Sequence, residues 1–98
     1  MIKIVAENFV KKEYVEEFLQ LASELTTESR KEEGCISYAL YEALDDQTHL
    51  TFIEEWKDAE AIRKHDASEH FKKIVPKLGG LCDKEGKVEK YQEAVPGK

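Results

Sequence analysis

The chain has 98 residues, which is enough for one domain and too few for two. It carries 15 Lys and Arg against 21 Asp and Glu, a net charge of −6, with the two signs interspersed. Because no stripe of basic residues is present, neither nucleic acid nor an anionic membrane surface is an expected partner.

Targeting signals and cysteine motifs are not found either. No run of residues is apolar enough to span a bilayer, and the segment after Met1 has no charged leader followed by an apolar stretch. Cys35 and Cys82 are not spaced as Cys-x-x-Cys, so a redox or zinc motif is not indicated. The chain is therefore expected to start near Met1 and to stay in the cytoplasm.

The first half of the chain predicts a strand and a long helix. Residues 2–9 alternate between two faces and are rich in β-branched side chains, and both faces carry apolar groups. Residues 11–32 change to the 3,4 spacing of an amphipathic helix, which Gly34 is expected to end. A strand with two apolar faces should be covered on both sides.

The middle of the chain predicts a β-hairpin. Residues 35–42 and 49–57 both alternate, and Asp45-Asp46-Gln47 forms a polar turn between them. The short connection predicts that the two strands pair in antiparallel fashion.

The second half predicts two short helices and a weak strand. Asp58 and Ser68 are candidate N-caps of the two helices. Pro76 is expected to kink or break the second helix, because proline lacks a backbone donor. Residues 86–92 are expected to form the last strand, and residues 94–98 a frayed tail.

This order of elements predicts an α+β fold of the ferredoxin-like type, β-α-β-β-α(α)-β. An antiparallel four-stranded sheet should carry the helices on one face. The other face keeps apolar and aromatic groups, including Phe9 and Tyr41 or their neighbours. A second copy of the same sheet would cover them, so a homodimer is expected.

Three stretches together carry a family resemblance. They are Glu33-Gly34-Cys35-Ile36-Ser37-Tyr38, then Leu50-Thr51-Phe52-Ile53-Glu54-Glu55-Trp56 running into Asp58-Ala59-Glu60-Ala61, and His65 followed by Ser68-Glu69-His70-Phe71. In their joint order and spacing the chain resembles the antibiotic biosynthesis monooxygenase family, from the first strand to the last. Residues 1–98 are therefore expected to form a single domain of that type.

The resemblance implies a dimeric α/β barrel, with a pocket between the sheet and the helices of each subunit. Several family members oxygenate quinol-like or polycyclic aromatic substrates with dioxygen and without metal or flavin. Others degrade haem, and one branch acts on a phosphorylated autoinducer sugar and is not an oxygenase. The family therefore does not fix the chemistry.

Two residues are the candidate catalytic groups. Asn8 resembles the strand-1 Asn of some members, and its amide could hold developing oxyanion charge; the alternative is a turn residue that bonds its own backbone. His65 matches the family's helix His and could take a proton from a phenol or quinol, which would give the anion that reacts with dioxygen. The alternative is a half-buried histidine satisfied by a backbone carbonyl.

The candidate substrate-binding residues are mostly aromatic. Trp56 is either a core anchor or a wall of the pocket, and Glu54 on the same strand face is either paired with a cation or placed in the pocket or dimer seam. Three further residues could line an apolar pocket or belong to the plain core: Tyr38, Phe52 and Phe71.

His70 completes the substrate-binding set. On a continuous helix it would lie about 140° around the axis from His65, so the pair would not share a face, but the break between the two helices leaves their relation open. With no His-x-x-x-His pair and no Cys cluster, a metal site is not expected. His49, at a strand edge, is expected to face solvent.

The leading function is a cofactor-independent monooxygenase that acts on a quinol or related phenolic, with the small molecule and dioxygen as partners. Haem chemistry is disfavoured, because Val75 stands near the place where haem-binding members supply the axial His. A sugar-phosphate isomerase or processing enzyme would hold its anion near Arg63, Lys64 or Lys72. A non-catalytic dimeric binding module would fill the pocket with its own side chains, whereas the quinol enzyme needs an apolar pocket with few charges.

Overall fold

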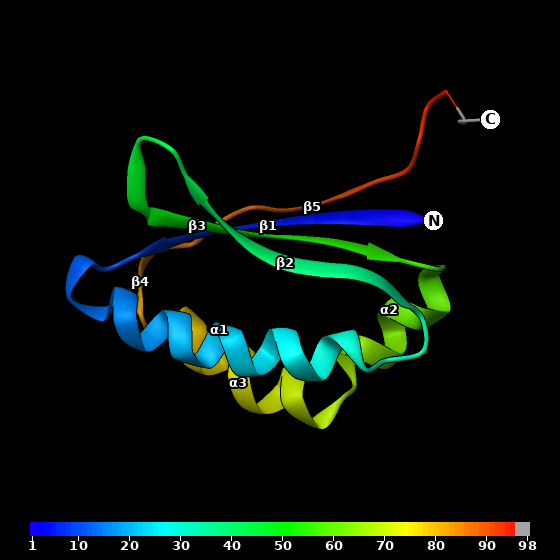
Figure 1. Ribbon diagram of the computed structural model, residues 1–98, viewed down its shortest axis with the longest axis horizontal. Helices are drawn as coiled ribbons and strands as arrows, with labels where there is room; N and C mark the ends of the chain where they lie inside the picture. Colours follow the sequence, from blue (N-terminus) through cyan, green and yellow to red (C-terminus); the bar gives the residue numbers. More distant parts are fainter. Residues whose placement is uncertain (96–98) are drawn as a thin grey trace.

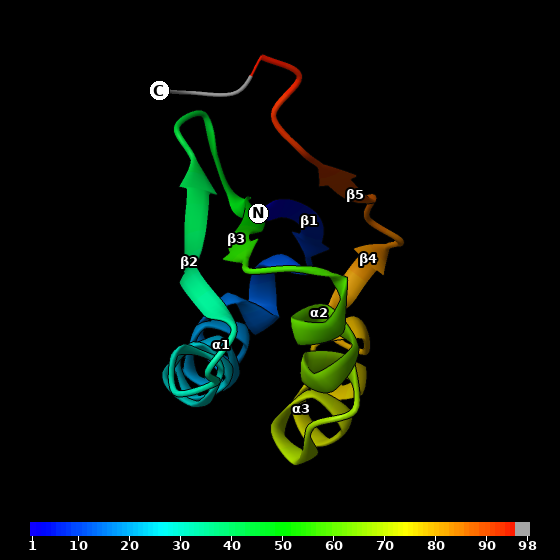
Figure 2. The same ribbon diagram turned by 90° about the vertical axis from the view of Figure 1, so that its right-hand side faces the viewer.

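An antiparallel sheet lies over a layer of helices in the computed structural model, which describes residues 1–95 (Figure 1). Seen from the end, α1 lies beneath the β2 side of the sheet, and α2 and α3 lie beneath its other side (Figure 2). The elements are β1 (Ile2–Val10), the 3-10 turn η1 (Lys12–Tyr14), α1 (Val15–Arg30), β2 (Cys35–Ala43), β3 (Asp46–Trp56), α2 (Ala59–Asp66), α3 (Glu69–Gly79), β4 (Cys82–Lys84) and β5 (Val88–Tyr91). The predicted α+β fold with helices on one face is confirmed.

The strand order is β2-β3-β1-β4, and β5 also pairs with β1. β4 pairs with the end of β1 at Phe9 and Val10, and β5 pairs with its start, so the two short strands follow one another along the same edge. The last strand predicted over residues 86–92 is observed as β5, whereas β4 was not predicted, so the sheet has five strands rather than the expected four. Between β4 and β5, Gly86 passes β1 so closely that a Cβ there would collide with the carbonyl oxygen of Glu7.

The β2–β3 hairpin is tighter than expected. Pairing continues to Ala43 opposite Asp46, which leaves Leu44 and Asp45 as a two-residue loop. The predicted turn at residues 45–47 is wrong by one to two positions. The Asp46 carboxylate accepts hydrogen bonds from the backbone N–H and the hydroxyl of Thr48, and so holds the first residues of β3.

Both predicted N-caps are observed. The Asp58 carboxylate accepts the N–H of Ala61 at 2.9 Å, and the Ser68 hydroxyl accepts the N–H of Phe71 at 3.3 Å. The expected break at Pro76 is not found, because α3 runs through it to Gly79. Pro76 lies in the last turn, where the missing N–H removes a single hydrogen bond from a helix that is about to end.

The core fills the space between the sheet and the helices. Phe18 and Leu25 of α1, Ile74 of α3 and Trp56 of β3 are all fully or almost fully buried in it. Gly34 allows the start of β2 to approach α2, since a Cβ there would collide with that of Ala61.

Two further expectations concern membranes and the tail. Across residues 1–95, every helix falls short of the length and apolar character that a bilayer crossing requires. Of the predicted frayed tail 94–98, residues 96–98 lie outside the described part of the chain.

Candidate active site

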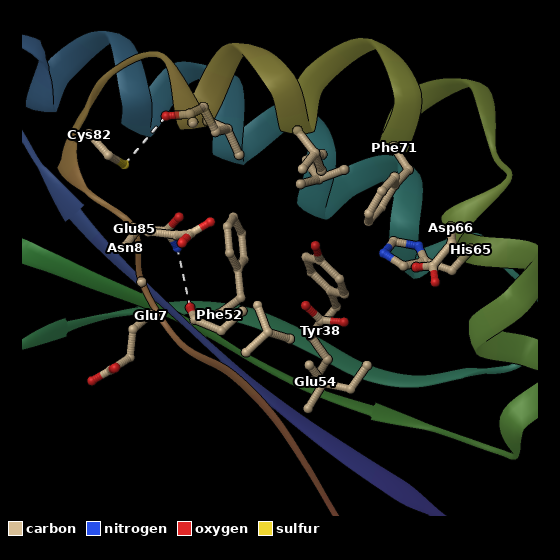
Figure 3. A pocket seen from close by; sticks show the side chains of 18 of the residues that line it. Glu7, Asn8, Tyr38, Phe52, Glu54, His65, Asp66, Phe71, Cys82 and Glu85 are labelled. Atoms are coloured by element: carbon tan, nitrogen blue, oxygen red, sulfur yellow. Dashed lines mark hydrogen bonds between the residues drawn. The ribbon is translucent and has the colours of Figure 1, made fainter.

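A cavity of about 650 Å³ lies between the sheet and the α2–α3 pair. Its walls are largely apolar, with Ile4 of β1, Phe52 of β3, Ile62 of α2 and Val75 of α3 among them. Figure 3 shows aromatic side chains that rise from the sheet into this space and Phe71 that reaches it from the helices. A cavity of this size and character suits a small aromatic molecule.

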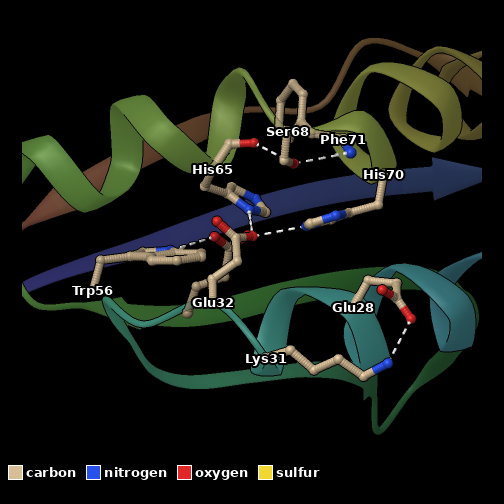
Figure 4. A network of polar contacts seen from close by, with 9 residues as sticks. Glu28, Lys31, Glu32, Trp56, His65, Ser68, His70 and Phe71 are labelled. Carbon is tan, nitrogen blue, oxygen red and sulfur yellow. Dashed lines mark hydrogen bonds and ion pairs between the residues drawn. The ribbon is translucent and has the colours of Figure 1, made fainter.

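Six of the eight predicted site residues line the cavity: Asn8, Tyr38, Phe52, Glu54, His65 and Phe71. Trp56 and His70 are not among its lining residues. Trp56 instead packs against the His65 ring, and His70 contacts Glu32, the residue that also contacts His65 (Figure 4).

His65 is held by a carboxylate. Its Nδ1 lies 2.7 Å from Oε2 of Glu32, and the residue is only 2% exposed. With Glu32 ionised, Nδ1 must donate, so Nε2 carries the lone pair of the neutral ring. The imidazole lies at the cavity wall beside Phe71 (Figure 3). A carboxylate that fixes the tautomer of a pocket histidine is an arrangement suited to general base chemistry.

Glu32 is the residue that sequence reasoning missed. It follows α1 in the loop before β2, and its partners His65 and His70 come 33 and 38 positions later. No local spacing links residues so far apart. The one available signal is an acidic residue directly before the Glu33-Gly34-Cys35 stretch that carries the resemblance.

His70 meets the same carboxylate oxygen. Its Nε2 lies 2.8 Å from Oε2 of Glu32, and its ring centroid is 6.0 Å from that of His65. The two histidines therefore converge, although a continuous helix would have separated them. The chain turns at Ala67 and Ser68 between α2 and α3, which brings His70 round to the Glu32 side.

Trp56 joins His65 to a second acid. The indole is fully buried, packs against the imidazole with ring centroids 4.4 Å apart, and donates from Nε1 to Oε1 of Glu54 at 2.8 Å. Burial raises the pKa of Glu54 to about 7, with smaller increases from the charges of Asp66 and Glu32 and an opposing decrease from the Trp56 bond. Glu54 can thus gain or lose a proton near neutral pH.

Asn8 lies within β1, opposite Leu50 and two residues before the strand ends at Val10. Its Nδ2 donates to the carbonyl oxygen of Ala6 at 3.2 Å, which is the backbone contact considered as the alternative. A primary amide has two donor hydrogens and one acceptor oxygen, so this bond leaves capacity for a ligand in the cavity.

The remaining polar lining is mainly acidic. Glu54, Asp66 and Glu85 line the cavity together with Lys90. Glu7 and Lys84 also border it, but their side chains contact His49 and Phe9. Tyr38 also lines it, and burial with the nearby charge of Glu54 raises the pKa of its phenol, so it stays neutral. Of this group, sequence reasoning missed Asp66, Glu85 and Lys90, which no motif distinguishes from surface charges.

The comparisons with known proteins agree with this architecture. Residues 1–77 match the family model described as antibiotic biosynthesis monooxygenase. Over 77 residues, 79% of this chain and 81% of the relative, the sequence is 39% identical to the "Putative monooxygenase YcnE" of Bacillus subtilis strain 168.

Solved structures show the same fold. A conserved protein from Methanosarcina mazei Go1 has a TM-score of 0.92 and 44% identity, with 94% of this chain and 91% of that one covered. The crystal structure of an antibiotic biosynthesis monooxygenase also has a TM-score of 0.92, with 38% identity over 98% of this chain and all of the other. The chain therefore belongs to the antibiotic biosynthesis monooxygenase family.

Proposed function

We propose that this protein is a cofactor-independent monooxygenase that acts on a quinol or a related phenolic aromatic molecule. The observation that supports it most is the Glu32–His65 pair at the wall of a largely apolar cavity of about 650 Å³. An aromatic substrate would be held by the apolar walls, and its hydroxyl would meet the basic Nε2 of His65.

The proposed reaction uses the substrate as its own reductant. His65 removes a phenolic proton, and the electron-rich anion then transfers electrons to dioxygen. Overall, one quinol and one dioxygen give one hydroxyquinone and one water. One oxygen atom forms a new carbon–oxygen bond, the other leaves as water, and the four electrons come from the quinol.

Glu54 and Asn8 would assist the reaction of the substrate by proton transfer and hydrogen bonding. With a pKa of about 7, Glu54 can supply a proton to a reduced oxygen and recover it near neutral pH. The Asn8 amide can donate a hydrogen bond to oxygen charge that develops in the reaction.

The alternative functions receive less support from the cavity. Arg63, Lys64 and Lys72, the groups expected to hold a sugar phosphate, do not line it, and Arg63 pairs with Glu60. The acidic groups Asp66 and Glu85 of the lining would also repel a doubly charged phosphate more strongly than the singly charged anion of a phenol. A space of about 650 Å³ is not filled by the protein's own side chains, as a module without a ligand would require.

We also propose a homodimer in the cytoplasm. The sheet face opposite the helices exposes Tyr41 at 55% and Tyr91 at 48%, and a second sheet would bury them. Cys35 and Cys82 are free thiols, which suits a reducing compartment. Light scattering at micromolar concentration should give twice the chain mass, and a monomer mass would contradict the dimer.

The test of the function is product analysis under ¹⁸O₂ with a reduced naphthoquinol and metal-stripped protein. We expect a hydroxynaphthoquinone with one labelled oxygen atom, formed faster than in a blank that measures autoxidation. Thermal shifts with naphthoquinols and with sugar phosphates provide the comparison of ligand classes. Product formation at the blank rate, with a melting shift from sugar phosphates alone, would contradict the proposal.

A further inference from the structure

We propose that Glu32, His65 and His70 form a binding site for a divalent transition-metal ion of the zinc class. One ligand atom from each residue lies within 4.8 Å of the others. The site goes beyond the monooxygenase proposal, and the binding of the metal does not depend on it.

The donor set selects the class of metal. Two imidazole nitrogens and one carboxylate oxygen suit Zn²⁺, Ni²⁺, Co²⁺ or Cu²⁺, whereas Mg²⁺ and Ca²⁺ require mainly oxygen ligands. Zinc sites with three protein ligands are common, and a water molecule completes their tetrahedron. The side chains of Glu32 and His70 are each 17% exposed, so the ion has an entrance and the water has room.

The distances require small movements. Zinc lies about 2.0–2.2 Å from its nitrogen and oxygen ligands, which places two tetrahedral ligands about 3.4 Å apart. The Glu32 oxygen lies 2.7 and 2.8 Å from the two ring nitrogens. The Glu32 oxygen must therefore move away from the two ring nitrogens by roughly 0.6–0.7 Å, which rotation of the partly exposed Glu32 and His70 side chains can provide.

The electrostatic surroundings favour a cation. Among residues 1–95, no lysine or arginine pairs with Glu32, and its ion pairs are those with the two imidazoles. Its negative charge contributes to the raised pKa values of Cys35 and Glu54. A divalent ion would neutralise this excess of negative charge.

The backbone between the two histidines is fixed in place. The Ser68 hydroxyl donates to the backbone carbonyl of His65 at 2.6 Å and accepts the N–H of Phe71. One side chain thus ties the end of α2, which carries His65, to the start of α3, which carries His70. Such a prearranged pair of ligands lowers the entropy cost of binding an ion.

The metal ion has a consequence for His65 that rests on the proposed function. A metal ion on Nδ1 takes the lone pair there, so the neutral ring must carry its proton on Nε2. The nitrogen on the cavity side would then donate rather than accept a hydrogen bond. Zinc should therefore inhibit proton removal from a phenol.

The chain contains a matched control. His49 Nε2 lies 3.2 Å from Oε2 of Glu7, so this pair also joins an imidazole to a carboxylate. It has no second histidine, and it does not belong to the group of potential metal ligands within residues 1–95. A pair without a third ligand should bind zinc far more weakly.

The experiment is calorimetric titration of Zn²⁺ into the metal-stripped full-length chain. We expect one ion per chain, and a loss of affinity of more than about a hundredfold in both Glu32→Gln and His70→Gln, because even changes in outer-shell partners cost about 10–100-fold. His49→Gln should bind as the wild type does. Melting curves of the metal-free variants verify their folding, and the visible absorption of bound Co²⁺ reports the ligand set independently.

Several outcomes would overturn the site. They are no zinc binding up to millimolar concentration, unchanged binding in Glu32→Gln and His70→Gln, or an equal loss in His49→Gln. None of these measurements uses a substrate, so failure of the metal site and failure of the monooxygenase proposal are separate results.

Discussion

Two histidines in this molecule have nearly the same immediate partners and very different surroundings. His65 contacts Glu32 and packs against Trp56 at 4.4 Å, and His49 contacts Glu7 and stacks on Phe9 at 4.6 Å. The His65 side chain is 3% exposed, whereas that of His49 is 28% exposed.

The two pairs lie on opposite faces of the sheet. His49 and Phe9 are paired across β3 and β1 on the face without helices, whereas His65 approaches the other face from α2 and lines the cavity. A charge interaction is weaker in water than in a dry cavity. The comparison teaches that a histidine–carboxylate contact gains a chemical role from its burial and its neighbouring cavity, not from the contact itself.

The largest expected effect is the loss of the buried imidazole. His65→Gln should lower the turnover of a reduced naphthoquinol by about 10²–10⁴-fold, because it removes the general base. His49→Gln should keep the wild-type rate. Initial rates of oxygen uptake, corrected for autoxidation, measure both, and equal losses in the two variants would remove the distinction between the pairs.

The next largest effect on turnover is expected when the carboxylate partner of each histidine is changed. Glu32→Gln should lower turnover by about 10–100-fold, because the tautomer of His65 is no longer fixed, while Glu7→Gln should have no effect. The pH–rate profile of Glu32→Gln should also move, which a purely structural role would not cause. A profile that keeps its shape and position would refute the orienting role of Glu32.

A stability effect is expected at Glu54, which Trp56 links to the buried pair. Its pKa is raised from 4.5 to about 7, so the folded protein holds a proton that the unfolded chain releases, and stability falls as the pH rises from about 4.5 to 7. Glu54→Gln removes this pH dependence of the stability. It should be more stable than the wild type above pH 7 by on the order of 2–3 kcal/mol and similar to it near pH 4.

Urea unfolding at a series of pH values measures this difference. The Gln oxygen can still accept the Trp56 N–H, so the hydrogen bond is retained in the variant. A wild type and variant with parallel stability profiles would show that Glu54 is not held as the acid in the folded protein.

A smaller effect is expected from the aromatic partners. Trp56→Phe keeps a ring near His65 but removes the N–H that bonds Glu54, at a cost of about 1–3 kcal/mol for lost packing and an unpaired acceptor. Phe9→Leu on the exposed pair should cost under about 1 kcal/mol, as partly exposed positions usually do. Thermal unfolding at one pH compares the two, and a larger loss for Phe9→Leu would reverse the proposed ranking.

The sequence was sufficient for the fold because the pattern of the elements is local. The alternation of residues 2–9, the helical spacing of residues 11–32 and the caps Asp58 and Ser68 are all visible within a few positions. The expected break at Pro76 was wrong, because the effect of a proline depends on its distance from the helix end. The short strand β4 was not predicted, because it pairs with the end of β1, far away in the sequence.

The site was harder to predict from the sequence, because its contacts join residues that are far apart in the chain. His65 could be identified from the resemblance, but Glu32 could not, since their contact depends on how α1 and α2 pack at the end of the sheet. The sequence leaves the relation of His65 and His70 open, because a single helix axis would separate them and the turn at Ser68 changes that axis. The sequence also predicts a solvent-facing His49, whose side chain is 28% exposed, but the nearly complete burial of His65 depends on the packing of distant elements.

The most direct test of the account is the ring tautomer of His65 in the metal-free protein. Long-range ¹H–¹⁵N correlation spectra at about pH 8 show which ring nitrogen carries the proton, and His49 provides a comparison in the same spectrum. We expect a proton on Nδ1 of His65 and a bare Nε2, with this preference lost in Glu32→Gln. A proton on Nε2 of His65 in the wild type would contradict it, because that nitrogen could not then accept a proton from a substrate.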